Sequence, residues 1–294
     1  MPDEAARSVV MPAETPFIPM HGHGEGCREP LKSGCVVLSR LPGGRSSIRA
    51  LAPSLKYVLH GEEVYHIDGR TRCVRAGEFL LVEAGTDFEV RTARPEETVG
   101  LCVYLGVTHG SPAARETLEL GRVINGSPVE PLAGLLGHYA RLLAARPAAG
   151  PSLARRIVQE ATIGAEDYLA TFANRLERLG SLKRSTRIET LQRVERARCF
   201  IHAHSGRTIT LEEIAAEAAL SRFHLTRSFA EVHGLPPLAY HRRLRLEAAA
   251  QLLKREAASA TEVAEQLGYG SLSAFTRAFR QAFGVPPSQA RAAA

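Results

Sequence analysis

The stretch SATEVAEQLGYGSLSAFTRAFRQAFGVPPSQAR, residues Ser259–Arg291, predicts two short helices joined by a tight turn. Ser259 and Glu262 have the spacing of a capping box, in which two side chains satisfy free N–H groups at a helix start. Glycines at positions 268 and 270 favour a turn, and Gly284 suits the end of the second helix. The stretch therefore predicts the order helix, turn, helix.

The second of these helices, expected over Ser271–Phe283, has an apolar face and a polar face. Three phenylalanines recur every four residues and can share one face toward a core: Phe275, Phe279 and Phe283. Polar and cationic side chains fall on another side: Ser273, Arg277 and Arg280. A first helix over Thr261–Leu267, a turn and this helix are typical of a helix-turn-helix DNA reader.

The same pattern occurs earlier, in TLEEIAAEAALSRFHLTRSFAEVHGLPP, residues Thr210–Pro237. Its capping box, Thr210 with Glu213, lies 49 residues before the other one. After the turn the offset is 50, so that Arg227 corresponds to Arg277. The extra residue lies in the second turn. Helices are expected over Leu211–Ala218 and Arg222–His233, which places the two motifs at residues 210–234 and 259–284.

These stretches resemble the C-terminal domain of the AraC/XylS family of transcription regulators, which has two such motifs joined by a long helix. The resemblance covers about residues 190–291. Its signature stretches here are SRFHLTRSFAEVHG, LRLEAAAQLL and GYGSLSAFTRAFRQAFGVPPSQAR. The sequence departs from the family pattern at Ala290, where the family usually has an aromatic residue.

The resemblance implies that both second helices face DNA bases. The base-facing positions carried over from the family are Phe223, Thr226, Arg227, Leu272, Ser273, Ala274 and Arg277. The two arginines suit this role because a guanidinium can bond guanine O6 and N7 together. Other arginines suit phosphate contacts, which position a protein without reading sequence: Arg222, Arg242, Arg243, Arg245 and Arg280. For each residue, a solvated helix face is the alternative.

Two further helices complete this domain. An opening helix is expected over Leu191–Ser205, with core contributors Val194, Cys199 and Ile201. A connecting helix is expected over Pro236–Lys254, with core contacts at Leu238, Leu246 and Leu253. A connecting helix of this kind can hold two readers at the separation of successive major grooves.

Charge and composition agree with nucleic acid as a partner. Residues 1–183 contain 21 Lys/Arg and 21 Asp/Glu, whereas residues 184–294 contain 16 and 10, so the whole excess of +6 lies in the C-terminal part. The five cysteines form no CxxC pair, which favours reduced thiols. No signal segment or membrane-spanning run is expected, so the predicted location is cytoplasmic.

Residues 1–30 predict a flexible N-terminal arm, since prolines and the run HGHGEG oppose regular structure. His21, His23, Glu25 and Cys27 carry metal-binding groups. Glycines between them leave the groups unorganised, so no metal site is predicted there.

Residues 31–110 contain seven short β-rich runs separated by turn signals such as Asp68-Gly69. The runs are Cys35–Leu41, Leu55–Leu59, Val64–Ile67, Arg72–Arg75, Phe79–Val82, Phe88–Thr92 and Val99–Val107. The stretch YVLHGEEVYHIDGRTRCVRAGEFLLVEAG resembles the cupin-type barrel that precedes the DNA-binding domain in many members of the family. A cupin-like effector-binding barrel is therefore expected over residues 31–125.

Many cupins hold a catalytic metal, so an enzyme is the main alternative. The first ligand segment of that pattern falls on Ile48–Ser54, which contains no His, Cys, Asp or Glu, and Phe88 occupies the position of the later His. His60 and His66 remain as a weaker pair. The sequence therefore predicts no metal, no cofactor and no catalytic residue.

Residues 126–183 turn helical, with segments Val129–Ala145 and Ser152–Leu179. The second segment carries an apolar stripe: Leu153, Ile157, Ala161, Ala165, Leu169, Phe172, Leu176 and Leu179. The stripe can pack on the barrel, form a homodimer interface, or do both. The polar run GSLKRSTR, residues 180–187, reads as a linker before the DNA-binding domain, 184–294.

The predicted fold class is α+β multidomain, with a β-barrel, a helical dimerisation segment and an all-α double helix-turn-helix domain. The predicted function is sequence-specific transcription regulation in response to a small-molecule effector. The resemblance implies double-stranded DNA and RNA polymerase as partners and an activating role, although no motif distinguishes activation from repression. Two alternatives stay open: a cupin-like metal enzyme with a helical appendage, and a DNA-binding regulator whose barrel only contacts proteins.

Overall fold

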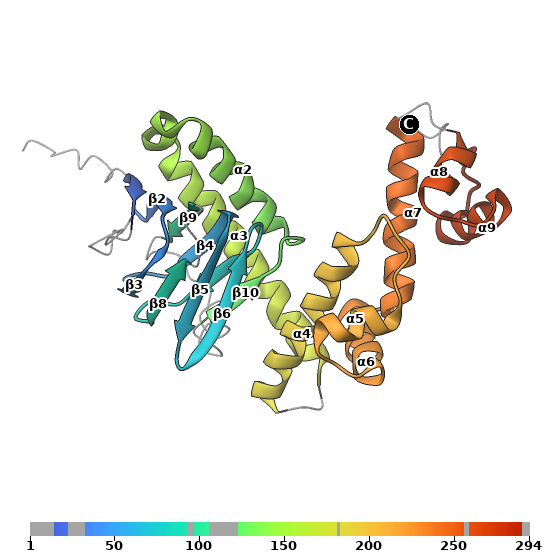
Figure 1. Ribbon diagram of the computed structural model, residues 1–294, viewed down its shortest axis with the longest axis horizontal. Coiled ribbons are helices and arrows are strands. Elements are labelled where there is room, and N and C mark those ends of the chain that lie inside the picture. Colours follow the sequence, from blue (N-terminus) through green and yellow to red (C-terminus); the bar gives the residue numbers. More distant parts are fainter. Residues whose placement is uncertain are drawn as a thin grey trace, which may run out of the picture. The chain divides into compact units, whose positions relative to one another are not determined.

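The computed structural model describes residues 15–22, 33–92, 97–105, 123–180, 183–255 and 259–289 (Figure 1). The chain divides into two compact units, Met1–Thr171 and Phe172–Ala294. The boundary lies inside one continuous helix, α3 (Gly150–Arg178). It therefore differs from the predicted boundary at residues 183 and 184.

The strands of the first unit form two sheets. The six-stranded sheet has the order β1 (Phe17–His21), β2 (Cys35–Leu41), β9 (Thr98–Tyr104), β4 (Ser54–His60), β7 (Phe79–Val82), β10 (Val123–Gly126). The four-stranded sheet has the order β3 (Gly44–Arg49), β8 (Asp87–Thr92), β5 (Glu62–Ile67), β6 (Arg70–Arg75). Among the described strands, no ladder joins the two sheets, so they do not close into one hydrogen-bonded barrel.

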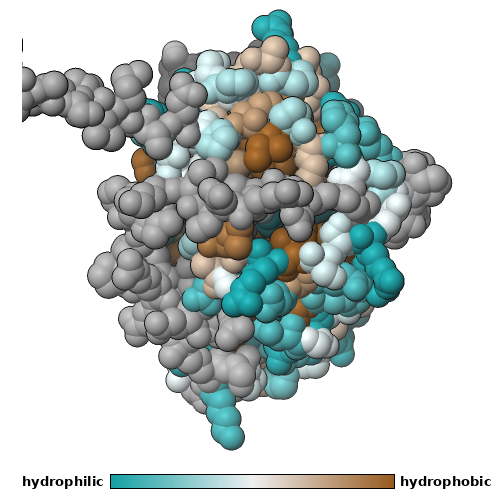
Figure 2. Space-filling model, turned by 90° about the vertical axis from the view of Figure 1, so that its left-hand side faces the viewer, coloured by the Kyte–Doolittle hydropathy of each residue, from teal (hydrophilic) through white to brown (hydrophobic). Residues whose placement is uncertain are grey.

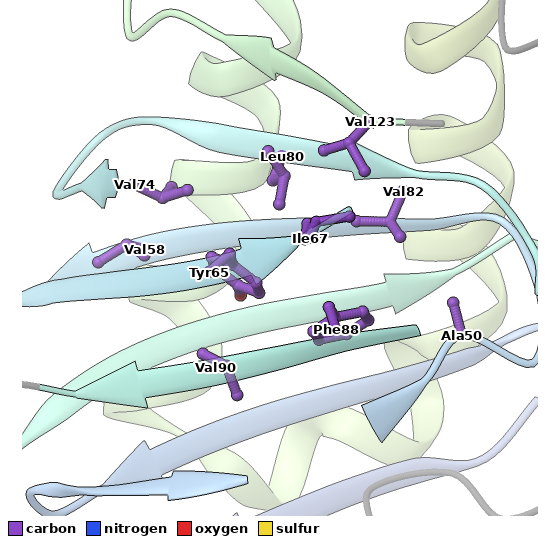
Figure 3. Close-up of a cluster of buried hydrophobic side chains, with 10 residues drawn as sticks. All are labelled: Ala50, Val58, Tyr65, Ile67, Val74, Leu80, Val82, Phe88, Val90 and Val123. Carbon is purple, nitrogen blue, oxygen red and sulfur yellow. The ribbon is translucent and has the colours of Figure 1, made fainter. Parts of the chain in front are cut away.

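The two sheets share one buried core (Figure 3). The six-stranded sheet contributes Val58, Leu80, Val82 and Val123. The four-stranded sheet contributes Tyr65, Ile67, Val74, Phe88 and Val90. Because side chains alternate along a strand, each sheet can present one such row inward. Face-to-face packing of the two sheets follows from this shared core.

The predicted Asp68-Gly69 turn closes the hairpin between β5 and β6. Asp68 has φ 49° and Gly69 has φ 71°, the left-handed pair that a tight two-residue hairpin needs. The runs Cys35–Leu41 and Phe79–Val82 are confirmed as strands. Strands β3 and β10 were not expected from the sequence.

Helices cover the outer face of the six-stranded sheet. They are α2 (Pro131–Ala145), the short 3-10 helix η1 (Pro147–Ala149) and α3. Tyr139 in α2 donates a hydrogen bond to Glu160 in α3, with 2.6 Å between Oη and Oε2. The ring of Tyr168 in α3 packs edge-on against Phe79, and its hydroxyl donates to the Asn125 carbonyl. These contacts fix α3 to both α2 and the sheet.

The predicted apolar stripe of this helix is covered within the chain. Ile157, Ala161, Ala165 and Leu169 are at most 3% exposed, and Phe172, Leu176 and Leu179 are also buried. The large exposed apolar side chain of the described part of α3 is instead Ile163. Leu153, at the start of the stripe, is half-buried. Most of the stripe is therefore packing surface within the chain, and its use as a homodimer interface stays a prediction.

Part of the expected flexible arm is a strand. Residues Phe17–His21 pair in parallel with β2, from Phe17 opposite Val36 to His21 opposite Arg40. The aromatic ring of Phe17 also lies against Gly150, where an added methyl group would meet it at about 2.1 Å. The prediction of a flexible arm is thus wrong for this segment, because pairing with β2 satisfies the hydrogen-bonding groups of its backbone. His23, Glu25 and Cys27 lie outside the described residues.

The described residues of the second unit form six further helices: α4 (Arg184–Ala203), α5 (Leu211–Ala218), α6 (Arg222–His233), α7 (Pro237–Arg255), α8 (Ala260–Gln266) and α9 (Leu272–Phe283). The predicted limits of α5 and α6 are confirmed. The predicted linker is too long, because residues 184–187 already belong to α4. Ala290 lies outside the described residues.

The units differ in their exposed apolar side chains. Figure 2 shows the first unit from one side, with hydrophobic surface interspersed among hydrophilic side chains. Among the described residues, most of the exposed large hydrophobic side chains belong to the second unit: Phe223, Leu238, Leu272, Phe283 and Val285. In the described part of the chain, no helix is long and apolar enough to cross a membrane.

Candidate nucleic-acid interface

Helices α5 and α8 begin in the same way. The Thr210 hydroxyl accepts a hydrogen bond from the Glu213 N–H at 3.2 Å, and the Glu213 carboxylate accepts one from the Thr210 N–H at 2.7 Å. Ser259 and Glu262 form the same pair of bonds at 3.1 and 2.6 Å. Both predicted capping boxes are therefore confirmed, and each fixes the first helix of one motif.

The turns of the two motifs are related but differ in length. Ala219 ends α5 in the left-handed region, with φ 51°, and Gly268 takes the corresponding place after α8, with φ 66°. Gly270 is the extra residue of the second turn. Glycine adopts this conformation without penalty, whereas the Cβ of an alanine comes too close to the following carbonyl oxygen. The first turn is therefore the more strained one.

The second helix of each motif has matching ends. The Ser221 hydroxyl accepts from the His224 N–H at 3.2 Å, and the Ser271 hydroxyl accepts from the Ala274 N–H at 3.1 Å. Gly234 and Gly284 close the two helices, both with φ 76°. Both helices thus start and stop at equivalent residues, so the side chains between them face equivalent directions.

The inner faces of both repeats pack as predicted, with one exception in the second repeat. Leu225 and Phe229 of α6 and Phe275 and Phe279 of α9 are at most 1% exposed. Phe283 was expected in the core but is 37% exposed, because it lies in the last turn of α9. Its ring still packs on Phe279, with 4.6 Å between the ring centroids.

Helix α7 joins the two motifs. Leu246 and Leu253 are buried as predicted, and both belong to the core that α7 shares with α8 and α9. Leu238 was also expected in a core, but it is 39% exposed in the first turn of this helix. Leu238 therefore belongs to the surface of the unit.

The outer faces carry the residues predicted to read bases. Phe223 is 72% exposed and Leu272 is 44% exposed, so neither has a core role. Exposed side chains also include Arg227, Ser273, Ala274 and Arg277. Thr226 is half-buried, and its hydroxyl donates to the Arg222 carbonyl at 2.8 Å.

The residues predicted to contact phosphate also lie on the surface, with one partial exception. Arg222, Arg242, Arg243 and Arg280 are exposed. Arg245 is half-buried, and its guanidinium lies 5.7 Å from the ring centre of Tyr269, in the turn of the second motif. Arg245 therefore stabilises this turn through a cation–π contact as well as offering a positive charge.

Carboxylates hold the arginines of the first motif. Arg227 Nε lies 2.9 Å from Glu231 Oε1, and Arg222 Nη1 lies 2.6 Å from Glu212 Oε1. The bond from Arg222 also holds the pKa of the Glu212 carboxyl below its ordinary value. Both guanidiniums are therefore engaged by carboxylates within the chain. Neither carboxylate was singled out from the sequence, although the Arg227–Glu231 spacing of four residues is a known helical ion-pair signal.

The second motif lacks this restraint. Position 281, the counterpart of Glu231, is a glutamine. Among the residues that the structure describes, Arg277 and Arg280 have no ion-pair partner. The two recognition helices therefore share a backbone plan and differ in their free positive charge.

A buried histidine distinguishes the end of α6. The His233 side chain is 7% exposed and lies 3.5 Å from Glu195, while its ring packs on Phe229 and Tyr240. Burial lowers the pKa of His233 to about 3, and nearby guanidiniums, Arg198 first, add to the shift. His233 is neutral at pH 7 as a result, and its counterpart in α9 is the exposed Phe283.

The first unit provides no metal-binding cluster among its described residues. Phe88, at the expected ligand position, is buried in the core beside Ile48. His60 is exposed, and His66 contacts the Thr71 hydroxyl through Nδ1 at 3.0 Å. The described residues therefore supply no donor set for a catalytic metal.

One polar site in the first unit was missed from the sequence. A cavity of about 60 Å³ lies between the sheets, and Lys56, Cys102, Tyr104, Glu63 and Tyr65 supply its polar lining. Lys56 was overlooked because it lies in an apolar run, SLKYVLH. Strand alternation places it with Ser54 and Val58 on the inward face, which was the available signal.

Two exposed recognition helices, held by one connecting helix, define the second unit as a DNA-binding module with two helix-turn-helix motifs. A family model described as a helix-turn-helix domain matches residues 214–293. The RCS-specific HTH-type transcriptional activator RclR of Escherichia coli (strain K12) is 40% identical over 86 residues, which are 29% of this chain and 30% of that protein. The chain therefore carries the DNA-binding domain of the AraC/XylS family of transcription regulators, as the sequence predicts.

Longer similarities run through both units. The HTH-type transcriptional activator RhaS of Escherichia fergusonii is 27% identical over 73% of this chain and 84% of its own length. The matches to the first curated relatives span only about 30% of those proteins. All these relatives are transcription regulators, the class expected, rather than enzymes.

Solved structures also match. The DNA-binding domain of AdpA in complex with a target DNA is 30% identical, with a TM-score of 0.32, over 34% of this chain and 90% of that chain. ToxT from Vibrio cholerae is 12% identical, with a TM-score of 0.33, over 88% of this chain and 97% of that chain.

Proposed function

We propose that the whole chain is a sequence-specific transcription regulator that reads DNA with α6 and α9. The observation that carries this proposal is the equivalence of the two helices. Each has a serine cap, a buried phenylalanine and an exposed arginine at matching positions, Arg227 and Arg277. Two readers at a fixed separation suit successive major grooves of one duplex.

The proposal assigns base contacts to the exposed positions of both helices. They are Phe223, Thr226, Arg227, Leu272, Ser273, Ala274 and Arg277. Phe223 suits the methyl group of thymine, and each arginine suits guanine. Phosphate contacts fall to Arg222, Arg242, Arg243, Arg245 and Arg280, whose charges position the domain without reading sequence.

The proposal also gives the first unit a sensing role. Its two sheets act as a cupin-like effector-binding domain, supported by the cavity between them and by the partial polar lining of that cavity. RNA polymerase, a homodimer, transcription activation and a cytoplasmic location belong to the proposal through the family resemblance. A regulator whose first unit only contacts proteins is the second candidate, and a ligand that shifts the melting temperature of the full chain distinguishes the two.

The test is to incubate the full chain with sheared DNA of its host and to sequence the retained fragments. A shared motif is expected, with two protected segments about one helical turn apart. Retention of fragments without a common motif would contradict sequence-specific regulation. Retention of a single half-site, unaffected by changes in α9, would contradict reading by both helices.

A further inference from the structure

The cavity between the sheets of the first unit has a buried cation on its wall. Lys56 projects from β4, is 8% exposed, and lies among apolar lining residues such as Val37, Ile48 and Val90. Transferring an ammonium group from water into such surroundings costs several kcal/mol unless charge or hydrogen bonds compensate. The contacts of Lys56 therefore decide what the cavity can bind.

The contacts of Lys56 within the chain are weak acceptors. Its Nζ lies 2.7 Å from Cys102 Sγ and 3.4 Å from the Tyr104 hydroxyl oxygen. The ammonium also lies 4.5 Å from the ring centre of Tyr104 and 5.8 Å from that of Phe88. None of these partners is a carboxylate, and no ion pair of Lys56 occurs among the described residues.

The acidic group of the cavity is engaged elsewhere. Glu63 in β5 accepts a hydrogen bond from the Tyr65 hydroxyl and is itself 5% exposed. Lys56 lies on the opposite sheet, in β4, and pairs across its own sheet with Cys102. A cation and an acid thus line one cavity without forming an ion pair with each other, which leaves the ammonium able to take an anion from outside.

The size of the cavity limits that anion. A water molecule needs about 10–15 Å³ of such volume, so about 60 Å³ corresponds to four to six waters. A molecule with about four to six non-hydrogen atoms fills this space. Its remaining surface would meet Ile48, Phe88 and Val90, which favour an alkyl group over a sugar or a phosphate ester.

We propose that this cavity binds a small aliphatic carboxylate, with its oxygens on the Lys56 ammonium and its alkyl part between the two sheets. The inference rests on the proposed sensing role, because it names the chemical class of the effector. Charge-assisted hydrogen bonds are about twice as strong as neutral ones, so Lys56 supplies selectivity for the charged head. The apolar walls set the chain length.

The test is isothermal titration of the full chain with acetate, propionate, butyrate and hexanoate. Propionate and butyrate are expected to bind best. Butyramide, which matches butyrate in size but is neutral, and butylamine, which carries a cation in place of the carboxylate, should not compete. Lys56→Met should weaken butyrate at least tenfold, the loss expected for a charged hydrogen bond. The matched control Lys183→Met removes an exposed lysine and should leave binding unchanged.

A second variant keeps the result informative if Lys56→Met alters folding. Ile48→Ala enlarges the apolar end, so the optimum should move from butyrate toward hexanoate while the charge requirement persists. Equal binding of butyramide and butyrate, binding of butylamine alone, or no binding of any carboxylate would overturn the inference. The same protein preparation is also tested for selective retention of DNA. If it retains DNA selectively but binds no carboxylate, only the ligand proposal fails. If it retains no DNA selectively, the proposed regulator function fails.

Discussion

The two recognition helices, α6 and α9, have the same backbone plan and different electrostatic surroundings. In α6, Arg227 is held by Glu231 four residues later, whereas in α9 the corresponding residue is Gln281. The last residue of α6 is a buried histidine, His233, while the last residue of α9 is the exposed Phe283. The two motifs thus share caps and buried positions, while their surface residues give each motif a different charge.

The largest expected effect concerns the buried cores of the two motifs, which should contribute equally to stability. Phe229→Ala and Phe279→Ala each remove a ring that is at most 1% exposed. Each variant should lower the free energy of unfolding by about 3–5 kcal/mol, the usual loss for a buried aromatic ring. Urea denaturation of the full chain measures this. The matched control, Phe283→Ala, should cost much less, and an equal cost would show that α9 is packed differently.

The two helices should also differ in how they make the free energy of unfolding depend on pH. The folded pKa of His233 is about 3, below its ordinary 6.5, so the unfolded state binds more protons between these values. This contribution to stability is fully present above pH 6.5 and is lost as the pH falls toward 3, by at most about 1.4 kcal/mol per pH unit. His233→Phe should therefore flatten the decline in unfolding free energy between pH 7 and pH 5.

The control for this prediction exchanges the same residue types in the other repeat. Phe283→His places the imidazole at an exposed position, so it should leave the pH dependence of stability near that of the parent chain. An unchanged pH slope in His233→Phe would mean that His233 is solvated in solution.

The turns give a smaller effect. Gly268→Ala introduces a side chain at φ 66°, where the nearest foreign atom, Arg245 Nη2, lies 3.8 Å away. Strain rather than collision is therefore expected, and the free energy of unfolding should fall by about 1–2 kcal/mol. Ala219→Gly should shift stability the other way and by less, since added chain entropy offsets the relief of strain. Thermal melting of both variants checks the opposite signs.

The ion pair of α6 gives the smallest effect. Glu231→Gln makes α6 resemble α9 and frees the Arg227 guanidinium. An exposed pair at this spacing is worth about 0.3–0.5 kcal/mol, so affinity for the cognate site should rise roughly twofold. The gain should vanish when Arg227→Ala is also present, because the two changes then share one interaction. A gain that persists in the double variant would instead reflect general removal of negative charge.

Local signals in the sequence predicted much of the second unit. Capping boxes, glycine stops and four-residue phenylalanine spacing are short-range patterns, and they defined α5 and α6 with their observed limits. The predictions that Phe283 and Leu238 lie in the core were wrong, because periodicity shows which way a residue faces and not how far the core extends. Both lie at helix ends, where the core stops.

The first unit was harder to predict because its arrangement depends on contacts between distant residues. Strand β1 pairs with β2 across a separation that no local pattern encodes. The sequence showed the apolar stripe of α3 but not the surface against which it packs, because an apolar helix face fits a sheet or a second copy of the chain equally well. The role of Lys56 could not be predicted either, because the cavity that it lines forms only where the two sheets pack together.

The most direct test of the account measures the affinity of Arg227→Ala and Arg277→Ala for DNA. Each variant is titrated with the site selected in the DNA-retention experiment and with random duplex, and Arg280→Ala is the control from the same helix as Arg277. If the two arginines read bases, each variant should lose about 1–3 kcal/mol on the selected site and far less on random DNA. Arg280→Ala should weaken both DNAs alike and reduce the salt slope by about one. Equal losses on both DNAs for Arg227→Ala and Arg277→Ala would contradict base reading by the paired helices.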